Sequence, residues 1–390
     1  MTRSNQVAND ETGGAVRVAI VGPVEPYRSG IARHTTALAR ALQSKPGVRV
    51  KVVSFSRQYP AALFPGESDR ASDTRLPADL DLDMSLDSLN PLSWARAVET
   101  VRQFRPQLVL APAWTFFLAP CFAWVLRQLR RHGCRVVALV HNVADHDANL
   151  LRKRLSSWQL HQADAYLTHT RELAAEIARV VPGAQIEVFP HPVFEYPQPS
   201  GSLPRRAELE LLMFGIVRAY KGLDVLLRSL ALSQRPSVKL SVVGELWPDA
   251  GDVRRLAADL GIEHKLELAL HYVPDAEAAE YFARADVVML PYRSVTGSGV
   301  LPLAFYYGKP VAASRLPGFA ELVREGETGW LLPPGDAEAW ADAIDRDLSA
   351  EAARAMSSGI QAARKRLSFD AFAEKVLRLG ELPAGSLWPP

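Results

Sequence analysis

The stretch that decides the fold is Pro291–Val311, which reads PYRSVTGSGVLPLAFYYGKPV. It follows an apolar run, Ala285–Leu290, that is typical of a buried strand. A loop of small residues, Ser294–Gly299, leads into an apolar helical segment, Val300–Tyr307, that stops at Gly308. A strand, a small-residue loop and a helix present backbone N–H groups at a helix start, where amide donors and the helix dipole can hold phosphate. A strand-to-helix turn without a ligand explains this stretch equally well, so other parts of the chain must decide between the two.

Length and composition predict a folded two-domain protein with a net charge close to zero. A chain of 390 residues exceeds what one ordinary hydrophobic core serves. The apolar fraction of 48% and the charged fraction of 23% are typical of globular proteins, and a net charge of +2 argues against a nucleic-acid partner. The two cysteines, Cys121 and Cys134, lack metal-ligand or CxxC spacing, so we expect a reduced, cytoplasmic location.

The first predicted strand lies after a polar tail, residues 1–14, that is expected to be disordered. Val16–Val21 is almost wholly apolar, as in a parallel strand buried on both faces. The following loop ends at Gly30, where a helix over Ile31–Leu42 should begin. This loop is not the GxGxxG dinucleotide fingerprint. A glycine at this place would nevertheless let a ligand approach the backbone, with a plain loop as the alternative.

An acidic segment follows the next predicted strand, Val48–Ser54. Residues 57–93 are expected to be irregular, and they contain Asp79, Asp81 and Asp83 in alternation. This alternation could offer an Asp-x-Asp metal pair. A solvated acidic edge is the favoured interpretation, because the segment is loop-like and flanked by proline.

A strongly apolar stretch, Leu108–Trp124, could be mistaken for a membrane span but is interrupted by Pro112 and Pro120. A buried strand at Leu108–Ala111, an aromatic loop and a core helix beginning at Pro120 explain it better.

A histidine follows the next predicted strand, Arg135–Val140. His141 and Asn142 come directly after it, and His146 and Asp147 follow within seven residues. The carboxyl end of a parallel strand is where α/β proteins bind ligands, so a functional role for His141 is favoured over a structural one. A metal cluster is not expected, because no third ligand group is evident.

The N-terminal series ends in a proline-rich linker. Four prolines lie between His191 and Pro204, in a linker-like composition. We expect an N-terminal domain at 15–190, a linker at 191–207, a C-terminal domain at 208–368, and a C-terminal helix and tail at 369–390 that packs back on the N-terminal domain. The remaining elements expected before the linker are helices at Arg152–His161 and Glu172–Val180 and strands at Ala165–Thr168 and Glu187–Pro190.

A second cation-rich turn opens the C-terminal domain. The apolar strand Leu209–Phe214 leads through Arg218, Lys221 and Gly222 into a helix, Leu223–Leu232. Two cations beside a glycine at such a junction suit a diphosphate. Charges solvated at a helix start are the alternative, but a lysine there opposes the helix dipole, so binding is favoured.

The rest of the chain completes a second strand-helix series. The sequence therefore predicts an α/β protein of two Rossmann-like, doubly wound parallel-sheet domains that face each other across a cleft. The expected strands are Val238–Val243, ending in Gly244 and Glu245, Leu266–Leu270, Val287–Leu290 and Val311–Ala313, and the last expected helices are Ala337–Arg346, Ala350–Arg366 and Asp370–Leu379.

With these motifs together, the chain resembles a retaining glycosyltransferase of family 4 with the GT-B fold, and among these the bacterial members that build exopolysaccharide or cell-surface glycans. The C-terminal half carries the resemblance most specifically, and it covers nearly the whole ordered chain. The motifs are RAYKG, VVGE, ADVVMLPYRS, SGVLPLAFYYGKPVAAS and PGFAELVREGETGWLLPPGD in that half, and GPVEPYRSGIARHT, AWTFFLAP and HNVADHD before it.

The resemblance implies roles for individual residues. Lys221 would bind the donor diphosphate with Arg218, which lies three residues before it where many relatives place the arginine five before. His141 would contact the transferred sugar near the reacting centre. The donor-binding set would be Gly30, Gly244, Glu245, Thr296, Ser298 and Gly299.

The sequence departs from the family at one pair of positions. Many relatives carry a Glu-x7-Glu pair for the sugar hydroxyls and the ribose, where this chain has Val295 and Leu303. Neither side chain accepts a hydrogen bond. The candidates to replace the pair are Glu245, Asp147 and the hydroxyls of Ser294 and Thr296.

The expected activity is transfer of a sugar from a nucleoside diphosphate sugar to a hydroxyl acceptor, with retention of configuration. The expected acceptor is a glycan or a lipid-linked precursor, met at the inner face of the cytoplasmic membrane through contact with anionic lipid. No cofactor and no metal are expected, because cationic side chains would stabilise the diphosphate. The alternatives are an inactive sugar-nucleotide-binding or scaffold protein, suggested by the missing carboxylates, and a sugar-nucleotide epimerase of the same architecture.

Overall fold

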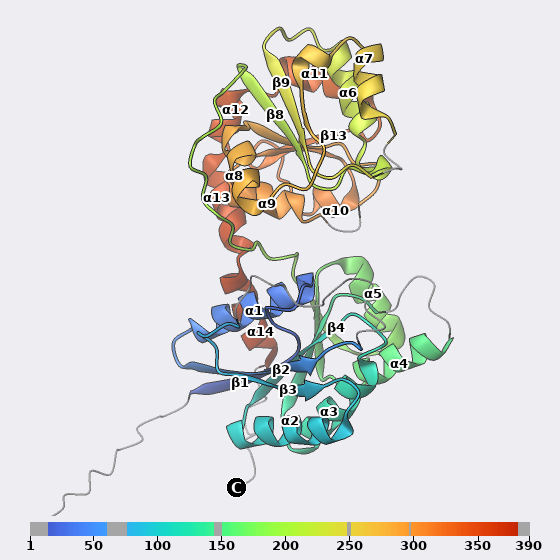
Figure 1. Ribbon diagram of the computed structural model, residues 1–390, viewed down its shortest axis with the longest axis vertical. Helices are drawn as coiled ribbons and strands as arrows, with labels where there is room; N and C mark the ends of the chain where they lie inside the picture. Colours follow the sequence, from blue (N-terminus) through green and yellow to red (C-terminus); the bar gives the residue numbers. More distant parts are fainter. Residues whose placement is uncertain (1–14, 61–75, 144–149, 248–250, 296–297, 381–390) are drawn as a thin grey trace, which may run out of the picture. The chain divides into compact units, whose positions relative to one another are not determined.

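The computed structural model describes residues 15–60, 76–143, 150–247, 251–295 and 298–380. The chain divides into two compact units. Unit 1 comprises residues 1–190 together with 369–390, and unit 2 comprises residues 191–368. Each unit contains one parallel sheet with helices on its faces (Figure 1).

The sheet of unit 1 has seven parallel strands in the order β3-β2-β1-β4-β5-β6-β7. β1 lies inside the sheet and pairs with both β2 and β4, so the strand order reverses beside it. Val18, Ala19, Ile20 and Val21 of β1 have no exposed surface, which accounts for the apolar run in the sequence. The strands are β1 (Val16–Val21), β2 (Val48–Arg57), β3 (Leu82–Asp87), β4 (Leu108–Ala113), β5 (Arg135–Val140), β6 (Ala165–Thr168) and β7 (Gln185–Val188).

The last helix of the chain packs on unit 1. In Figure 1 α14, coloured red, lies beside the dark-blue α1. Lys45, just after α1, pairs with Asp370 at 2.7 Å and with Glu374 at 2.8 Å. Phe372 of α14 is fully buried. The helices of unit 1 are α1 (Gly30–Gln43), α2 (Pro91–Phe104), α3 (Ala119–Arg131), α4 (Leu150–Leu160), α5 (Arg171–Val180) and α14 (Phe369–Gly380).

The sheet of unit 2 repeats this arrangement with six parallel strands in the order β10-β9-β8-β11-β12-β13. The order reverses between β8 and β11, so the switch point of this sheet lies at their carboxyl ends. Two clusters of buried side chains form its core, one around Phe282 and Phe305 and the other around Leu226 and Trp340. The strands are β8 (Leu209–Phe214), β9 (Val238–Val243), β10 (Leu266–Ala269), β11 (Val287–Leu290), β12 (Val311–Ser314) and β13 (Gly329–Leu332).

Helices flank the sheet of unit 2, and the predicted doubly wound α/β class is confirmed for both units. They are the short 3₁₀ turns η2 (Ala219–Lys221) and η4 (Glu263–Lys265) and the helices α6 (Leu223–Leu232), α7 (Val253–Asp259), α8 (Asp275–Arg284), α9 (Val300–Tyr306), α10 (Pro317–Ala320), α11 (Ala337–Arg346), α12 (Ala350–Ala355) and α13 (Ser357–Arg366).

Two sequence predictions about elements are wrong, and one strand was missed. Residues 57–93 are not irregular throughout, because they contain edge strand β3, which pairs with β2, and the start of α2. The helix predicted over Ala350–Arg366 is interrupted at Met356, whose ψ of 0° separates α12 from α13. Strand β13 was not predicted. Its Gly329 lies so close to β12 that an added Cβ would be 2.1 Å from the carbonyl oxygen of Val311.

The three alternating acidic residues of the segment before and within β3 all contact other side chains. Asp79 and Asp81 pair with Arg40 and Lys51 at 2.8 and 2.6 Å, and Asp83 accepts a hydrogen bond from Thr100 at 3.1 Å. These carboxylates therefore have protein partners on an exposed edge.

The apolar stretch Leu108–Trp124 contains strand β4 and part of helix α3. In the described part of the chain, no helix is both long and apolar enough to cross a membrane.

Candidate functional site

A cavity of about 430 Å³ lies in unit 2 beside the switch point of its sheet. Most of its lining residues come from the end of β8, from the segments that follow β8 and β9, and from the start of α9. This is the edge of an open α/β sheet where ligands bind. The lining residues are Tyr196, Phe214, Gly215, Ile216, Arg218, Tyr220, Lys221, Trp247, Gly299, Val300 and Leu303.

Lys221 is the most unusual of these residues because its amine is buried. The residue is only 7% exposed, and its Nζ lies over the ring of Tyr292 at 5.6 Å from the centroid. Among the described residues, no carboxylate pairs with this amine. Burial lowers the pKa of Lys221 to about 8, because it disfavours the charged form. A buried lysine on a cavity wall is suited to an anion that restores its charge.

Two glycines place Lys221 on this wall. Gly215 and Gly222 have φ of 87° and 70°, a region that other residues rarely adopt. A Cβ on Gly222 would lie 2.0 Å from the carbonyl oxygen of Pro291, so the turn packs directly against the end of β11. The RAYKG turn therefore packs on Pro291, the first residue of the segment Pro291–Val311.

Arg218 lies on the same cavity wall as Lys221 and is held by stacking. Its guanidinium carbon is 4.5 Å from the centroid of the Trp247 ring and 6.0 Å from that of Tyr220. Ile216, five residues before Lys221, also lines the cavity. Positions 216 and 218 therefore both face the cavity, so Arg218 reaches it although it lies three residues before Lys221 and not five.

The start of α9 contributes less than its sequence suggested. Gly299 lines the cavity, but its φ of −72° is accessible to any residue, and an added Cβ would contact nothing within 4 Å. Ser298 is half-buried and is not among the lining residues. α9 has only seven residues, which limits its dipole. Thr296 lies outside the described residues.

Gly244 and Glu245 occupy the end of β9 in different ways. Gly244 has φ of 136°, and a Cβ there would be 2.4 Å from the carbonyl oxygen of Gly215, so packing between two turns already requires this glycine. Glu245 is exposed, and its side chain does not line the cavity. Its backbone carbonyl accepts the N–H of Val217 at 2.8 Å.

The positions of the absent glutamates are apolar in the structure as well. Leu303 is 7% exposed and lines the cavity together with Val300. Val295 is half-buried and packs against Gly318. In the described part of this cavity, no acidic residue lines the wall, so cations face apolar and aromatic groups.

The remaining predicted residues lie in unit 1. His141 follows β5, and its ring centroid is 4.8 Å from that of His34 and 5.0 Å from that of His169. Neither His34 nor His169 was predicted from the sequence to belong to a site. A signal existed for His169, because it follows β6 directly, as His141 follows β5. Gly30 begins α1 and is exposed, and an added Cβ would contact nothing within 4 Å. Asp147 lies outside the described residues.

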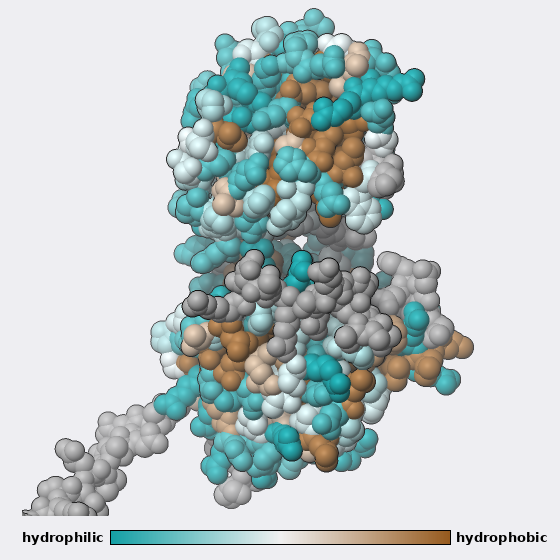
Figure 2. Space-filling model, in the orientation of Figure 1, coloured by the Kyte–Doolittle hydropathy of each residue, from teal (hydrophilic) through white to brown (hydrophobic). Residues whose placement is uncertain are grey.

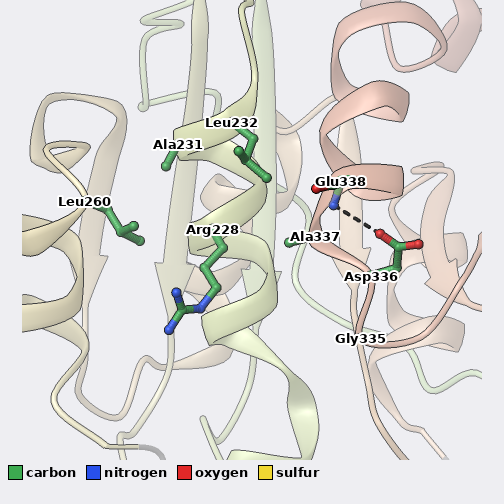
Figure 3. A pocket seen from close by; sticks show the side chains of 8 residues that line it. All are labelled: Arg228, Ala231, Leu232, Leu260, Gly335, Asp336, Ala337 and Glu338. Carbon is green, nitrogen blue, oxygen red and sulfur yellow. Dashed lines mark hydrogen bonds between the residues drawn. The ribbon is translucent and has the colours of Figure 1, made fainter.

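A second cavity of about 420 Å³ lies on the helical surface of unit 2 (Figure 3). It is lined by Arg228 and Leu232 of α6, by Leu260 and by the start of α11. Asp336 accepts the N–H of Glu338 at 3.1 Å there and so caps α11. None of the residues predicted to bind a ligand lines this cavity.

Both halves of the chain match families of glycosyltransferases. A family described as "Glycosyltransferase Family 4" matches residues 28–194, and "Glycosyl transferases group 1" matches residues 208–350. The chain belongs to this family of glycosyltransferases. The sequence resemblance is therefore confirmed at the level of the family and of the GT-B fold.

Individual relatives share less than a third of their aligned residues with this chain. The chain is 29% identical over 216 residues to a GDP-mannose:glycolipid 4-beta-D-mannosyltransferase of Xanthomonas campestris pv. campestris, which is 54% of this chain and 59% of that protein. It therefore spans about three fifths of that relative's length. A D-inositol 3-phosphate glycosyltransferase of Corynebacterium urealyticum is 28% identical over 68% of this chain and 69% of its own. The Anabaena protein HepE, solved in complex with UDP, matches with a TM-score of 0.64 and 17% identity, over 93% of this chain and 99% of that one. This structural likeness concerns the fold.

Proposed function

We propose that the protein transfers a sugar from a nucleoside diphosphate sugar to a hydroxyl acceptor, and that the cavity of unit 2 binds the donor diphosphate. The observation that supports this most is the buried amine of Lys221, with its lowered pKa, beside the stacked guanidinium of Arg218. Two cations in a partly apolar cavity interact with an anion more strongly than the same cations in water. The aromatic wall of Tyr220 and Trp247 offers surface for the rest of the donor.

In this proposal, catalysis consists of stabilising the departing diphosphate. Negative charge grows on the leaving oxygen as the bond to the sugar breaks, and Lys221 and Arg218 are already placed to neutralise it. Because these side chains supply positive charge, the donor site requires no metal ion. His141 of unit 1 is assigned to the transferred sugar and Gly30 to close backbone approach. Transfer is proposed to retain the configuration of the donor.

The donor base and the acceptor follow only from relatives. The Xanthomonas relative is named for GDP-mannose and a glycolipid, whereas HepE was solved with UDP. These names include two bases, so both kinds of donor belong in the test. A lipid-linked precursor of a surface or exopolysaccharide glycan is the proposed acceptor, because a glycolipid is the acceptor in the first of these names.

The test is a transfer assay with UDP-, GDP- and ADP-sugars and lipid-linked acceptors, followed by NMR assignment of the new anomeric centre. We expect one donor class to be consumed only with acceptor and to give a product with the donor's anomeric configuration. An inverted product would refute retention. Donor binding without transfer to any acceptor would favour a binding protein, and a changed sugar nucleotide without acceptor would favour an epimerase.

Donor affinity should depend on pH through Lys221. The free protein has a lowered pKa of about 8 at this amine, and a bound diphosphate favours the charged form. Affinity should therefore be constant well below pH 8 and fall as pH rises through 8, by up to about tenfold per pH unit. Calorimetric titration with an intact sugar nucleotide measures this. Lys221→Arg should remove the decline, because arginine stays charged, and an equal decline in both proteins would contradict the assignment.

We further propose that unit 1 contacts anionic membrane through α4. Leu150 and Leu151 are 77% and 65% exposed at its start, and the next three residues, Arg152, Lys153 and Arg154, are exposed and basic. Trp158 of the same helix is 39% exposed. Figure 2 shows hydrophobic residues at the edge of unit 1 over this helix. Apolar and basic groups together suit the boundary of a negatively charged leaflet, which would place the protein at the inner face of the cytoplasmic membrane.

Flotation with liposomes tests this surface. Binding should increase with anionic lipid and weaken with salt, since each basic residue near the surface contributes about 1 kcal/mol. The double variant Leu150→Asp and Leu151→Asp should float at least about tenfold less. Leu92→Asp is the matched control, because Leu92 is 72% exposed on α2 of the same unit. Equal loss in the control, or no flotation at any salt, would refute the proposal.

A further inference from the structure

Three histidines from distant parts of the sequence converge in unit 1. His34 lies on α1, and His141 and His169 directly follow β5 and β6. Their nearest ligand atoms all lie within 4.8 Å of one another. The three side chains are called the histidine cluster below. They lie at the carboxyl edge of the sheet, where strand ends bring residues of different βα units together.

The cluster has the surroundings of a ligand-binding site. His34 is 1% exposed, and the other two residues are half-buried. Phe369 and Phe372 of α14 pack against the ring of His34, each at a centroid distance of 5.2 Å. This apolar wall shields the cluster from water, as around a ligand-binding site.

His169 is oriented by a backbone contact that metal-binding histidines commonly make. Its Nδ1 lies 2.9 Å from the carbonyl oxygen of Phe189. Since a carbonyl can only accept, Nδ1 carries the proton and donates. The neutral ring then presents the lone pair of Nε2. A hydrogen bond of this kind fixes the tautomer and orientation of a ligating imidazole.

We propose that the histidine cluster binds a borderline divalent transition metal, with Zn²⁺ as the best match. Three imidazoles without a carboxylate suit zinc and its neighbours rather than Mg²⁺ or Ca²⁺, which prefer oxygen ligands. Zn–N bonds of about 2.0–2.1 Å in a tetrahedron place ligand nitrogens roughly 3.4 Å apart. Side-chain rotations that move the ring nitrogens by about 1–1.5 Å would shorten the distances between them from the present limit of 4.8 Å to that value. Three protein ligands leave a fourth position for water or a substrate oxygen.

The alternative for the same residues is a packed aromatic cluster in which the histidines only contact one another and α14. This alternative predicts no metal affinity. Metal binding requires neither donor nor acceptor. A bound metal would occupy the His141 ring that the proposed function assigns to the transferred sugar, so the two roles are alternatives for this side chain, and failure of metal binding would leave the proposed transfer activity unaffected.

The test is titration of the full-length protein, treated with chelator and desalted, with Zn²⁺ by calorimetry and with Co²⁺ by visible absorption. We expect one equivalent of each metal and the absorption bands of tetrahedral Co²⁺. His141→Gln and His169→Gln should each weaken binding by more than about 100-fold, beyond the 10–100-fold typical of an outer partner. His132→Gln is the matched control, an exposed histidine of the same unit, and should bind as the wild type does.

A measurement on the wild-type protein excludes unfolding of the variants as the explanation. The chain has nine histidines, and saturating Zn²⁺ should shift the imidazole NMR resonances of three of them. Absence of a one-to-one complex, equal loss in His132→Gln, or shifts confined to exposed histidines would overturn the proposal in favour of the packed cluster.

Discussion

Replacing Lys221 with alanine should lower the rate of sugar transfer by about a hundredfold or more, the usual loss when one contact to developing charge is removed. The fold should survive, because the folded protein disfavours the charged amine. A pKa lowered to about 8 means that the unfolded chain binds the proton more readily, so the free energy of unfolding rises with pH between 8 and the ordinary value of 10.5. Removing the amine should therefore leave stability at neutral pH unchanged or higher.

The measurement combines initial rates with thermal unfolding of the same preparations. Lys365→Ala is the matched control, since Lys365 is an exposed lysine of α13 in the same unit. Transfer within about threefold of the wild type in Lys221→Ala would remove the lysine from the chemistry. A fall in activity that follows a fall in melting temperature would assign it to the fold instead.

Gly222→Ala should strongly destabilise unit 2. The glycine has φ of 70°, and the new Cβ would lie 2.0 Å from the carbonyl oxygen of Pro291. Left-handed strain and overpacking together should lower the free energy of unfolding by about 2–5 kcal/mol. Donor affinity should fall as well, because the turn that carries Lys221 would have to move away from β11.

Gly261→Ala separates these two causes. Gly261 has φ of 68°, and a Cβ there would contact nothing within 4 Å, so only the left-handed strain of about 1–2 kcal/mol applies. Denaturant unfolding and donor titration of both variants make the comparison. Equal losses of stability in the two proteins would contradict the close packing of the turn on Pro291.

Sequence reasoning worked best for strands that are buried on both faces. Leu209–Phe214 and Arg135–Val140 were predicted with the bounds of β8 and β5, because continuous apolar runs between glycine or polar residues mark central parallel strands. β3 escaped notice for the opposite reason. It is a short edge strand that contains two acidic residues, Asp83 and Asp87, and its conformation depends on pairing with β2, which local sequence does not encode.

In the candidate site, too, the contacts within one turn could be predicted from the sequence, whereas the contacts between distant segments could not. Arg218, Lys221 and Gly222 belong to one turn, so their proximity was readable from spacing. The stacking of Arg218 on Trp247 and of Lys221 on Tyr292 joins separate βα units and required the fold. The histidine cluster was missed for this reason: a third ligand group was absent from the neighbourhood of His141 in sequence but present in space.

The central claim, that Lys221 and Arg218 bind the donor diphosphate, is tested most directly by comparing two ligands. One is the nucleoside diphosphate of the donor class selected in the transfer assay, and the other is the same nucleoside without phosphates. Two charge-assisted contacts of about 1.5–3 kcal/mol each should make the wild-type protein bind the diphosphate at least about a hundredfold more tightly. In the double variant Arg218→Met and Lys221→Met, calorimetry should show that this preference is lost while nucleoside affinity is kept. A preference that persists in the folded double variant would contradict the account.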